Sequence, residues 1–87
     1  MNCVMVILNY NDSRRALKLA ETCKEYSTID KVVIVDNKST DDSMDYLTNN
    51  LSSDIDLCKS VHNKGFAAGN NVGAKYVVKK YAPKYLL

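Results

Sequence analysis

The sequence predicts an α/β fold in which strands and helices alternate around a parallel sheet. Two apolar runs rich in β-branched residues, at residues 3–8 and 31–36, are typical of strands that are covered on both faces. Each run is followed by a stretch whose apolar residues recur at helical spacing. Strands and helices that alternate at such short intervals favour a three-layer α/β/α, Rossmann-like arrangement with a parallel sheet in the middle.

The first unit pairs strand 3–8 with a helix expected from about residue 13 to about residue 26. Asp12 or Ser13 suits the N-cap position, because a short side-chain oxygen can accept a backbone N–H there. Apolar residues at i, i+3, i+4 and i+7 predict the buried face of this helix. They are Ala16, Leu19, Ala20 and Cys23.

The second unit begins with strand 31–36 and is followed by a helix that we expect Ser39 or Thr40 to cap. Asp41 and Asp42 would then lie in the first turn, where the helix dipole favours negative charge. Because the dipole accounts for this acidic pair and no third ligand stands nearby, we assign no metal site to it. The inner face is expected to carry Met44, Leu47 and Leu51.

The third unit is less regular. Residues 54–61 alternate apolar and polar side chains, which predicts a strand near the sheet edge, with Ile55 and Leu57 facing inward. His62 has no Cys or Ser partner for a catalytic dyad, so we interpret it as a turn residue. A helix over 67–81 and the opening of a fourth strand at 84–87 follow. The inner face of the helix is expected to carry Val72, Gly73, Tyr76 and Val77.

Composition limits the possible functions. The 87 residues suit a single domain, 1–87, and exclude a multidomain enzyme. With 12 basic and 10 acidic residues, no basic face suits nucleic acid, so no nucleic-acid partner is expected.

Three cysteines without a CxxC pair argue against a zinc site or disulfides and suit a reducing, cytoplasmic location. No window approaches the roughly 20 apolar residues of a membrane span.

Ligands of parallel α/β sheets bind beyond the carboxyl ends of the strands, which here brings residues 9–12, 36–40 and 63–71 to one edge. Two uses of Asp36 are equally open: its carboxylate could accept bonds from the following turn, or from a ligand. Tyr10 could stack on a flat ligand or cap the edge of the sheet. Lys38, with Arg14 or Arg15, could meet a diphosphate or simply be solvated.

The stretch 63–73 contains all three glycines of the chain, spaced four residues apart. Within a helix they fall nearly on one face and allow a backbone or a ligand to approach closely. The stretch matches neither the Walker loop nor the GxGxxG fingerprint. Packing alone does not account for Asn63, Asn70 and Asn71 beside the glycines, because Asn is a poor helix former.

Together, VILNYND, VVIVDNKSTDDS and NKGFAAGNNVGAKYV resemble the N-terminal half of family-2 glycosyltransferases with the GT-A fold, closest to the rhamnosyltransferase-like members. The resemblance covers nearly the whole chain. It implies a nucleotide-diphosphate sugar donor and inverting transfer to a hydroxyl acceptor, as in polysaccharide biosynthesis. By motif, Asn9 and Tyr10 would line the base pocket, Asp36 would bond the base or ribose, and Asn37 would hold the turn. Asn63, Lys64 and Gly65 would border the base and ribose, and Gly69 and Asn70 would lie against the nucleotide.

The same resemblance implies what the chain lacks. In the family, the strand that begins near Tyr85 leads into an acidic DXD-type motif, which holds Mg or Mn, and a later half supplies the catalytic base. No residue here matches either, so we assign no catalytic residue, metal ligand or cofactor to this chain alone. We expect a truncated GT-A fold that binds the donor nucleotide without transferring sugar, and that forms a homo-oligomer through its exposed sheet edge.

Two other classes of function stay open from the residues alone. A non-enzymatic interaction module or receiver-like domain shares the layout, but a receiver needs an acidic pair after its first strand, where this chain has Asn9 and Tyr10. A nucleotidyltransferase half-domain usually carries a Gly- and Arg-rich loop there, and NYNDSRR contains no glycine.

Overall fold

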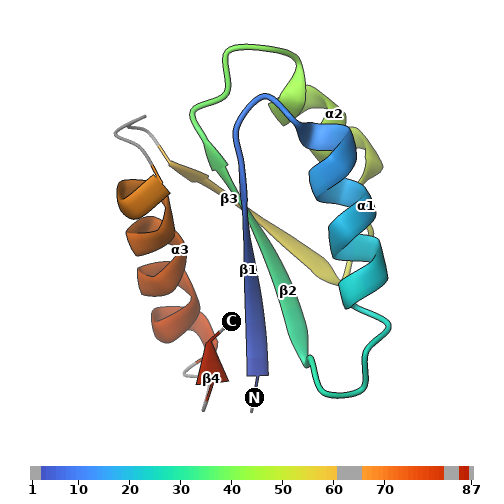
Figure 1. Ribbon diagram of the computed structural model, residues 1–87, viewed down its shortest axis with the longest axis vertical. Coiled ribbons are helices and arrows are strands. Elements are labelled where there is room, and N and C mark those ends of the chain that lie inside the picture. Colours follow the sequence, from blue (N-terminus) through green and yellow to red (C-terminus); the bar gives the residue numbers. More distant parts are fainter. Residues whose placement is uncertain (1–2, 61–65, 82–84, 87) are drawn as a thin grey trace.

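The computed structural model describes residues 3–60, 66–81 and 85–86 (Figure 1). Its strands form one parallel sheet in the order β3-β2-β1-β4. This alternation of strands and helices confirms the predicted α/β fold, with β3 at one edge of the sheet. In chain order the elements are β1 (Cys3–Asn9), α1 (Ser13–Cys23), β2 (Lys31–Asn37), α2 (Ser43–Asn50), β3 (Ile55–Ser60), α3 (Phe66–Tyr81) and β4 (Tyr85–Leu86).

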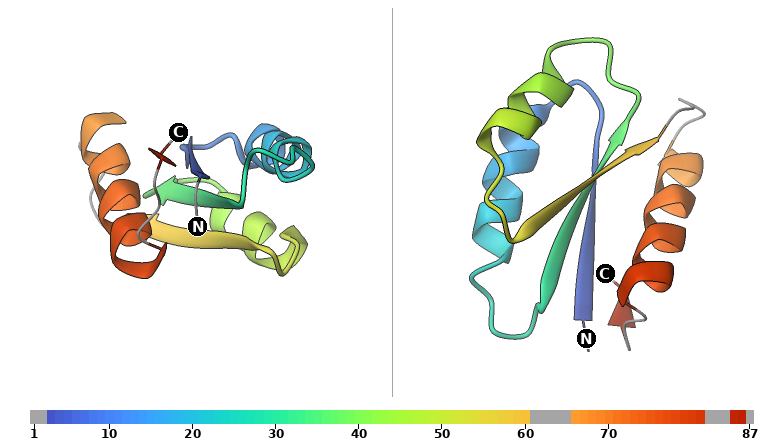
Figure 2. Two further views of the ribbon diagram at one scale, coloured as in Figure 1. Left: turned by 90° about the horizontal axis from the view of Figure 1, so that it is seen from below. Right: turned by 180° about the vertical axis from the view of Figure 1, so that it is seen from behind.

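Helices cover both faces of the sheet, with α1 and α2 on one face and α3 on the other (Figures 1 and 2). Because side chains alternate along a strand, each central strand contributes to two separate cores. On the α1 and α2 side, Ile7, Val32, Ile34 and Ile55 pack with Ala16, Ala20, Cys23 and Leu47. On the α3 side, Val4 and Val33 pack with Val77. The predicted three-layer arrangement is therefore confirmed.

Gly73 allows α3 to lie directly on the sheet. A Cβ atom at this position would lie 2.7 Å from Cγ2 of Val35 and 2.8 Å from Cγ1 of Val6, closer than carbon atoms pack. Gly73 and Val77 are buried and Val72 is half-buried, as the predicted inner face requires. The close approach that the glycine spacing predicted is thus confirmed at Gly73.

Asp56 on β3 ties the C-terminal half of α3 to the sheet. Its carboxylate accepts hydrogen bonds from the hydroxyls of Tyr76 (3.0 Å) and Tyr81, and from Lys80 Nζ (3.1 Å), and it pairs with Lys31 at 3.3 Å. Burial raises the pKa of Asp56, but the hydrogen bonds from Tyr81, Lys80 and Tyr76 outweigh it and lower the pKa to about 2. The carboxylate therefore stays charged and holds α3 in place.

The helix α1 differs from its predicted form in two ways. It ends at Cys23 rather than near residue 26, and Tyr26 is exposed in the turn that follows. The expectation that Leu19 is buried is wrong, since 48% of this residue is exposed. The buried stripe runs through Ser13, Ala16, Ala20 and Cys23, which places Leu19 on its flank.

The predicted start of α2 at Ser39 or Thr40 is also wrong. The helix begins at Ser43 with Asp42 at the N-cap, so Asp41 and Asp42 precede the first turn and Asp45 lies in it. The Ser39 hydroxyl instead donates to Asp36 of β2, and the Thr40 hydroxyl accepts a hydrogen bond from Nδ2 of Asn11. Asp41 instead accepts the Ser43 N–H at 2.8 Å.

No helix in the described part of the chain is long and apolar enough to cross a membrane.

Candidate functional site

Two buried polar side chains meet where β1 and β2 end. The parallel register places Asn9 opposite Asp36, and 1% and 0% of these residues are exposed. Nδ2 of Asn9 donates a hydrogen bond to Oδ1 of Asp36 at 2.9 Å. The residues directly before the pair, 4–8 in β1 and 32–35 in β2, are apolar, so the pair lies where the apolar core ends.

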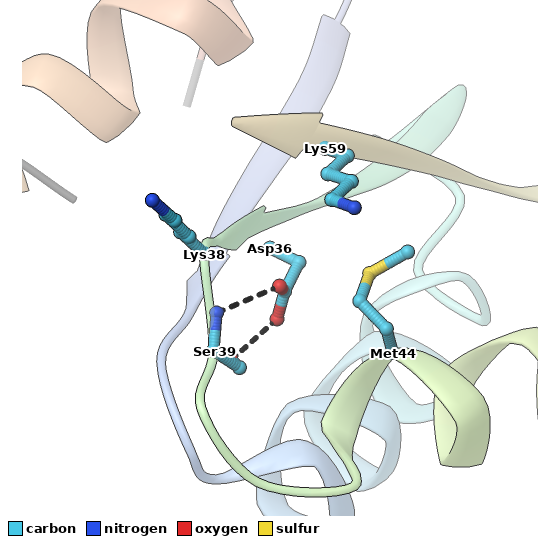
Figure 3. A pocket seen from close by; sticks show the side chains of 5 residues that line it. All are labelled: Asp36, Lys38, Ser39, Met44 and Lys59. Carbon is cyan, nitrogen blue, oxygen red and sulfur yellow. Dashed lines mark hydrogen bonds between the residues drawn. The ribbon is translucent and has the colours of Figure 1, made fainter. Parts of the chain in front are cut away.

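Asp36 holds the loop that follows β2. The backbone N–H of Ser39 donates to Oδ2 of Asp36 at 3.0 Å, and the Ser39 hydroxyl donates to Oδ1 at 2.6 Å (Figure 3). With the bond from Asn9, three donors satisfy a carboxylate that would be costly to bury alone. Of the two uses left open for Asp36, the structure shows the turn-holding one, and its contact with a ligand stays a prediction.

Asn11 joins the loop after β1 to the loop after β2. Its φ of 54° lies in the left-handed region, which Asn tolerates better than most residues. Nδ2 of Asn11 donates to Oγ1 of Thr40 at 3.0 Å, and its Oδ1 accepts the N–H groups of Thr40 (2.8 Å) and Asp41 (3.2 Å). The two loops are therefore held together at the carboxyl edge of the sheet.

A pocket of about 470 Å³ opens beside Asp36. Its other lining residues are Lys38, Ser39, Met44 and Lys59. Figure 3 shows Lys59 from β3 and Met44 from α2 extending toward each other across the pocket, whereas Lys38 points away from Met44. The register between β2 and β3 places Lys59 opposite Asp36. Neither lysine forms an ion pair with another described residue, so both amino groups are available to an anion.

The structure brings only some of the predicted site residues together. Asn9 and Asp36 are in contact, and Tyr10 follows directly with 43% of its surface exposed. Asn37 is buried and lies opposite Ser60 in the register of β2 and β3. The predicted residues Gly69 and Asn70 lie in the N-terminal part of α3, and Asn63, Lys64 and Gly65 fall outside the described residues.

Neither Asn11 nor Lys59 was predicted as a site residue, although Asn11 lies within the segment 9–12 expected at this edge. The sequence signal for Asn11 is its residue type, because Asn is favoured where a loop needs a left-handed residue. Lys59 reads as an ordinary solvent-facing position of an alternating strand. Only the register of β2 and β3 brings it beside Asp36, and one sequence does not fix that register.

The described residues do not fit a divalent cation. Residues 3–60, 66–81 and 85–86 contain no group of three or more His, Cys, Asp or Glu side chains placed to hold a metal ion. The Mg or Mn that the family resemblance implies therefore has no ligand set here, and no chemical step is derived through it.

Comparison with known proteins agrees with this architecture. The family model described as "Glycosyl transferase family 2" matches residues 4–82. The match spans β1, β2 and β3, the loops that hold Asn11 and Ser39, and the whole of α3. A search of curated proteins found no match. Because the family model covers most of the sequence, the chain belongs to glycosyltransferase family 2.

Proposed function

We propose that the chain binds the nucleotide part of a nucleotide-diphosphate sugar, as the N-terminal portion of an inverting glycosyltransferase. The observation that carries this proposal is the pocket beside Asp36 at the carboxyl ends of β2 and β3, in a member of glycosyltransferase family 2. Ligands of parallel α/β sheets bind at this edge. Family membership favours this function over a receiver-like module or a nucleotidyltransferase half-domain.

Tyr10 and Asp36 are the proposed contacts of the nucleoside. Tyr10 offers a ring that is 43% exposed beside the buried pair, and stacking on a base requires such a surface. Oδ2 of Asp36 accepts one hydrogen bond among the described residues, which leaves capacity for a base N–H or a ribose hydroxyl. Because Asp36 is fully buried, this contact requires that the side chains around it rearrange when the nucleotide binds.

Lys38 and Lys59 are the proposed source of attraction for the diphosphate. Both line the pocket, and neither is neutralised by a described carboxylate within ion-pair distance. Ammonium groups bind phosphate oxygens through charge-assisted hydrogen bonds. The likeness of the motifs to rhamnosyltransferase-like members favours a uridine or deoxythymidine diphosphate sugar. Because no catalytic base or cation ligand is assigned, we propose that these 87 residues bind the donor without transferring sugar.

Calorimetric titration of the folded chain with UDP, dTDP and ADP tests this proposal. We expect UDP or dTDP to bind more tightly than ADP. Tyr10→Ala should weaken that binding about tenfold, because base stacking on an aromatic ring is lost. Tyr26→Ala is the matched control, since Tyr26 is also exposed but follows α1 on the other side of the fold. Absence of binding by the folded wild-type chain, or equal losses in the two variants, would contradict the proposal.

A further inference from the structure

We infer that Asn11 is a positioning residue for nucleotide binding, because it fixes the loop that carries Tyr10 against the loop that Asp36 organises. This inference rests on the proposed function. Asn11 itself is not assigned a contact with the nucleotide.

The backbone of Asn11 sets the direction of the chain after Tyr10. Its left-handed conformation, with φ of 54°, turns the chain between Tyr10, which follows β1, and the start of α1. In this conformation its N–H points to the Ser39 hydroxyl and donates to Oγ at 3.0 Å. The same Oγ donates to Oδ1 of Asp36. A continuous hydrogen-bonded path therefore runs from Asn11 through Ser39 to Asp36.

The side chain of Asn11 completes the link. Its amide bonds to the neighbouring loop, with Nδ2 donating to Thr40 and Oδ1 accepting from the N–H groups of Thr40 and Asp41. These bonds are exposed to solvent, so each adds little to global stability. They instead order segment 39–41, which includes Ser39 at the wall of the pocket.

Two substitutions separate the backbone role of Asn11 from its side-chain role. Asn11→Gly keeps the left-handed conformation and removes all three side-chain bonds. Asn11→Asp tolerates the same φ and keeps the Oδ1 acceptor but loses the Nδ2 donor. Asn50→Ala is the control, because Asn50 is an exposed Asn whose Nδ2 bonds to the Tyr46 carbonyl at the far end of α2.

Each variant is titrated with UDP, and amide hydrogen exchange is measured without ligand. We expect Asn11→Gly to raise the Kd about fivefold, the size expected when a few exposed hydrogen bonds are lost. Exchange at the Thr40 and Asp41 amides should accelerate about tenfold, while the core amides of Val33 and Ile34 keep their protection. Asn11→Asp should fall between wild type and Asn11→Gly, and Asn50→Ala should match wild type.

Two results would overturn the inference. One is an Asn11→Gly variant that binds UDP with wild-type affinity. The other is a loss of affinity with equally faster exchange at Val33 and Ile34, which would show a general loss of stability. If the wild-type chain binds no nucleotide, the proposed function fails. The exchange measurement would then still show whether Asn11 orders segment 39–41.

Discussion

Asn9 of β1 and Asp36 of β2 lie opposite each other, and a 2.9 Å hydrogen bond joins Nδ2 of Asn9 to Oδ1 of Asp36. Both residues are buried, and each follows an apolar run within its strand. Oδ1 of Asn9 also accepts the N–H of Asp12 at 3.2 Å, so this pair fixes the loops on both sides of the site. The candidate site is therefore built outward from a polar contact inside the sheet.

Replacing Asp36 should lower both the stability of the fold and the affinity for the nucleotide. Asp36→Ala removes the acceptor of the half-buried Ser39 N–H and leaves the buried Asn9 amide with only a 3.4 Å contact to the Ser39 hydroxyl among the described residues. We expect the free energy of unfolding to fall by about 2 to 3 kcal/mol, measured by urea denaturation. Asp45→Ala is the control, because Asp45 is exposed in the first turn of α2 and its loss should cost less than about 1 kcal/mol. If Asp36→Ala and Asp45→Ala lowered the free energy of unfolding equally, the role given to Asp36 would be contradicted.

Adding one methyl group at Gly73 should destabilise the fold. In Gly73→Ala the new Cβ would meet Val35 and Val6 at 2.7 and 2.8 Å, so α3 must move away from the sheet. We expect thermal or urea unfolding to show a loss of about 1 to 3 kcal/mol. Gly73→Ala should reduce the free energy of unfolding less when it is introduced into a Val6→Ala variant than when it is introduced into the wild-type chain. A fully stable Gly73→Ala variant would show that α3 does not pack as described.

Stability should depend on the charge of Asp56 in acid. The pKa of Asp56 is lowered to about 2, below its unfolded value near 4, so its contribution is complete above about pH 4 and disappears as the pH falls toward 2. The contribution is on the order of 2 kcal/mol. Urea denaturation of wild type and Asp56→Asn between pH 2 and 6 measures it. The difference in unfolding free energy should shrink toward acid.

Asp54→Asn provides the control for that series. Asp54 lies close in sequence but is largely exposed, and within the part of the chain that the structure describes it has a single ion pair, with Lys24 at 3.5 Å. Asp54→Asn should therefore change the pH dependence of the unfolding free energy very little from that of the wild-type chain. If Asp54→Asn and Asp56→Asn changed the pH profile alike, the hydrogen-bonded cluster around Asp56 would not be the cause.

Strand positions were well predicted because each buried strand leaves an uninterrupted apolar run, and β1 and β2 differ from the predicted ranges by one residue each. Helix boundaries were less predictable. Ser39 and Thr40 have the residue types of helix caps, yet the Ser39 hydroxyl bonds to Asp36 and the Thr40 hydroxyl to Asn11, neither of which belongs to α2. Local sequence does not reveal such competition between caps and tertiary contacts.

The site was predictable in outline only. Residues at strand ends mark the edge of a parallel sheet where ligands bind, which is why Asp36 and residues 9–12 were expected there, and the role of Asn9 followed from the family resemblance. Asn11 and Lys59 depend on how two loops and two strands align in space. A single sequence contains the residue types but not that alignment, so their part in the site became visible only in the structure.

Self-association through the sheet edge is a further expected outcome. Among the described residues, β4 pairs with β1 only at Cys3 and Val4, so the rest of β1 has a strand neighbour on one side alone. Open edges of this kind favour pairing with another chain. We expect sedimentation to show a dimer or larger species. Sedimentation as a 9.7 kDa monomer alone at high concentration would contradict this expectation.

Titration of the folded, ¹⁵N-labelled chain with UDP and dTDP, followed by NMR, tests the nucleotide-binding proposal most directly. We predict chemical-shift changes centred on Tyr10, Asn11 and Ser39, and weaker changes in Asp36→Ala. The amides around Asp56, at the opposite end of β3, should not shift. A folded sample in which neither nucleotide moves any of these signals would contradict the proposal that this chain binds a donor nucleotide.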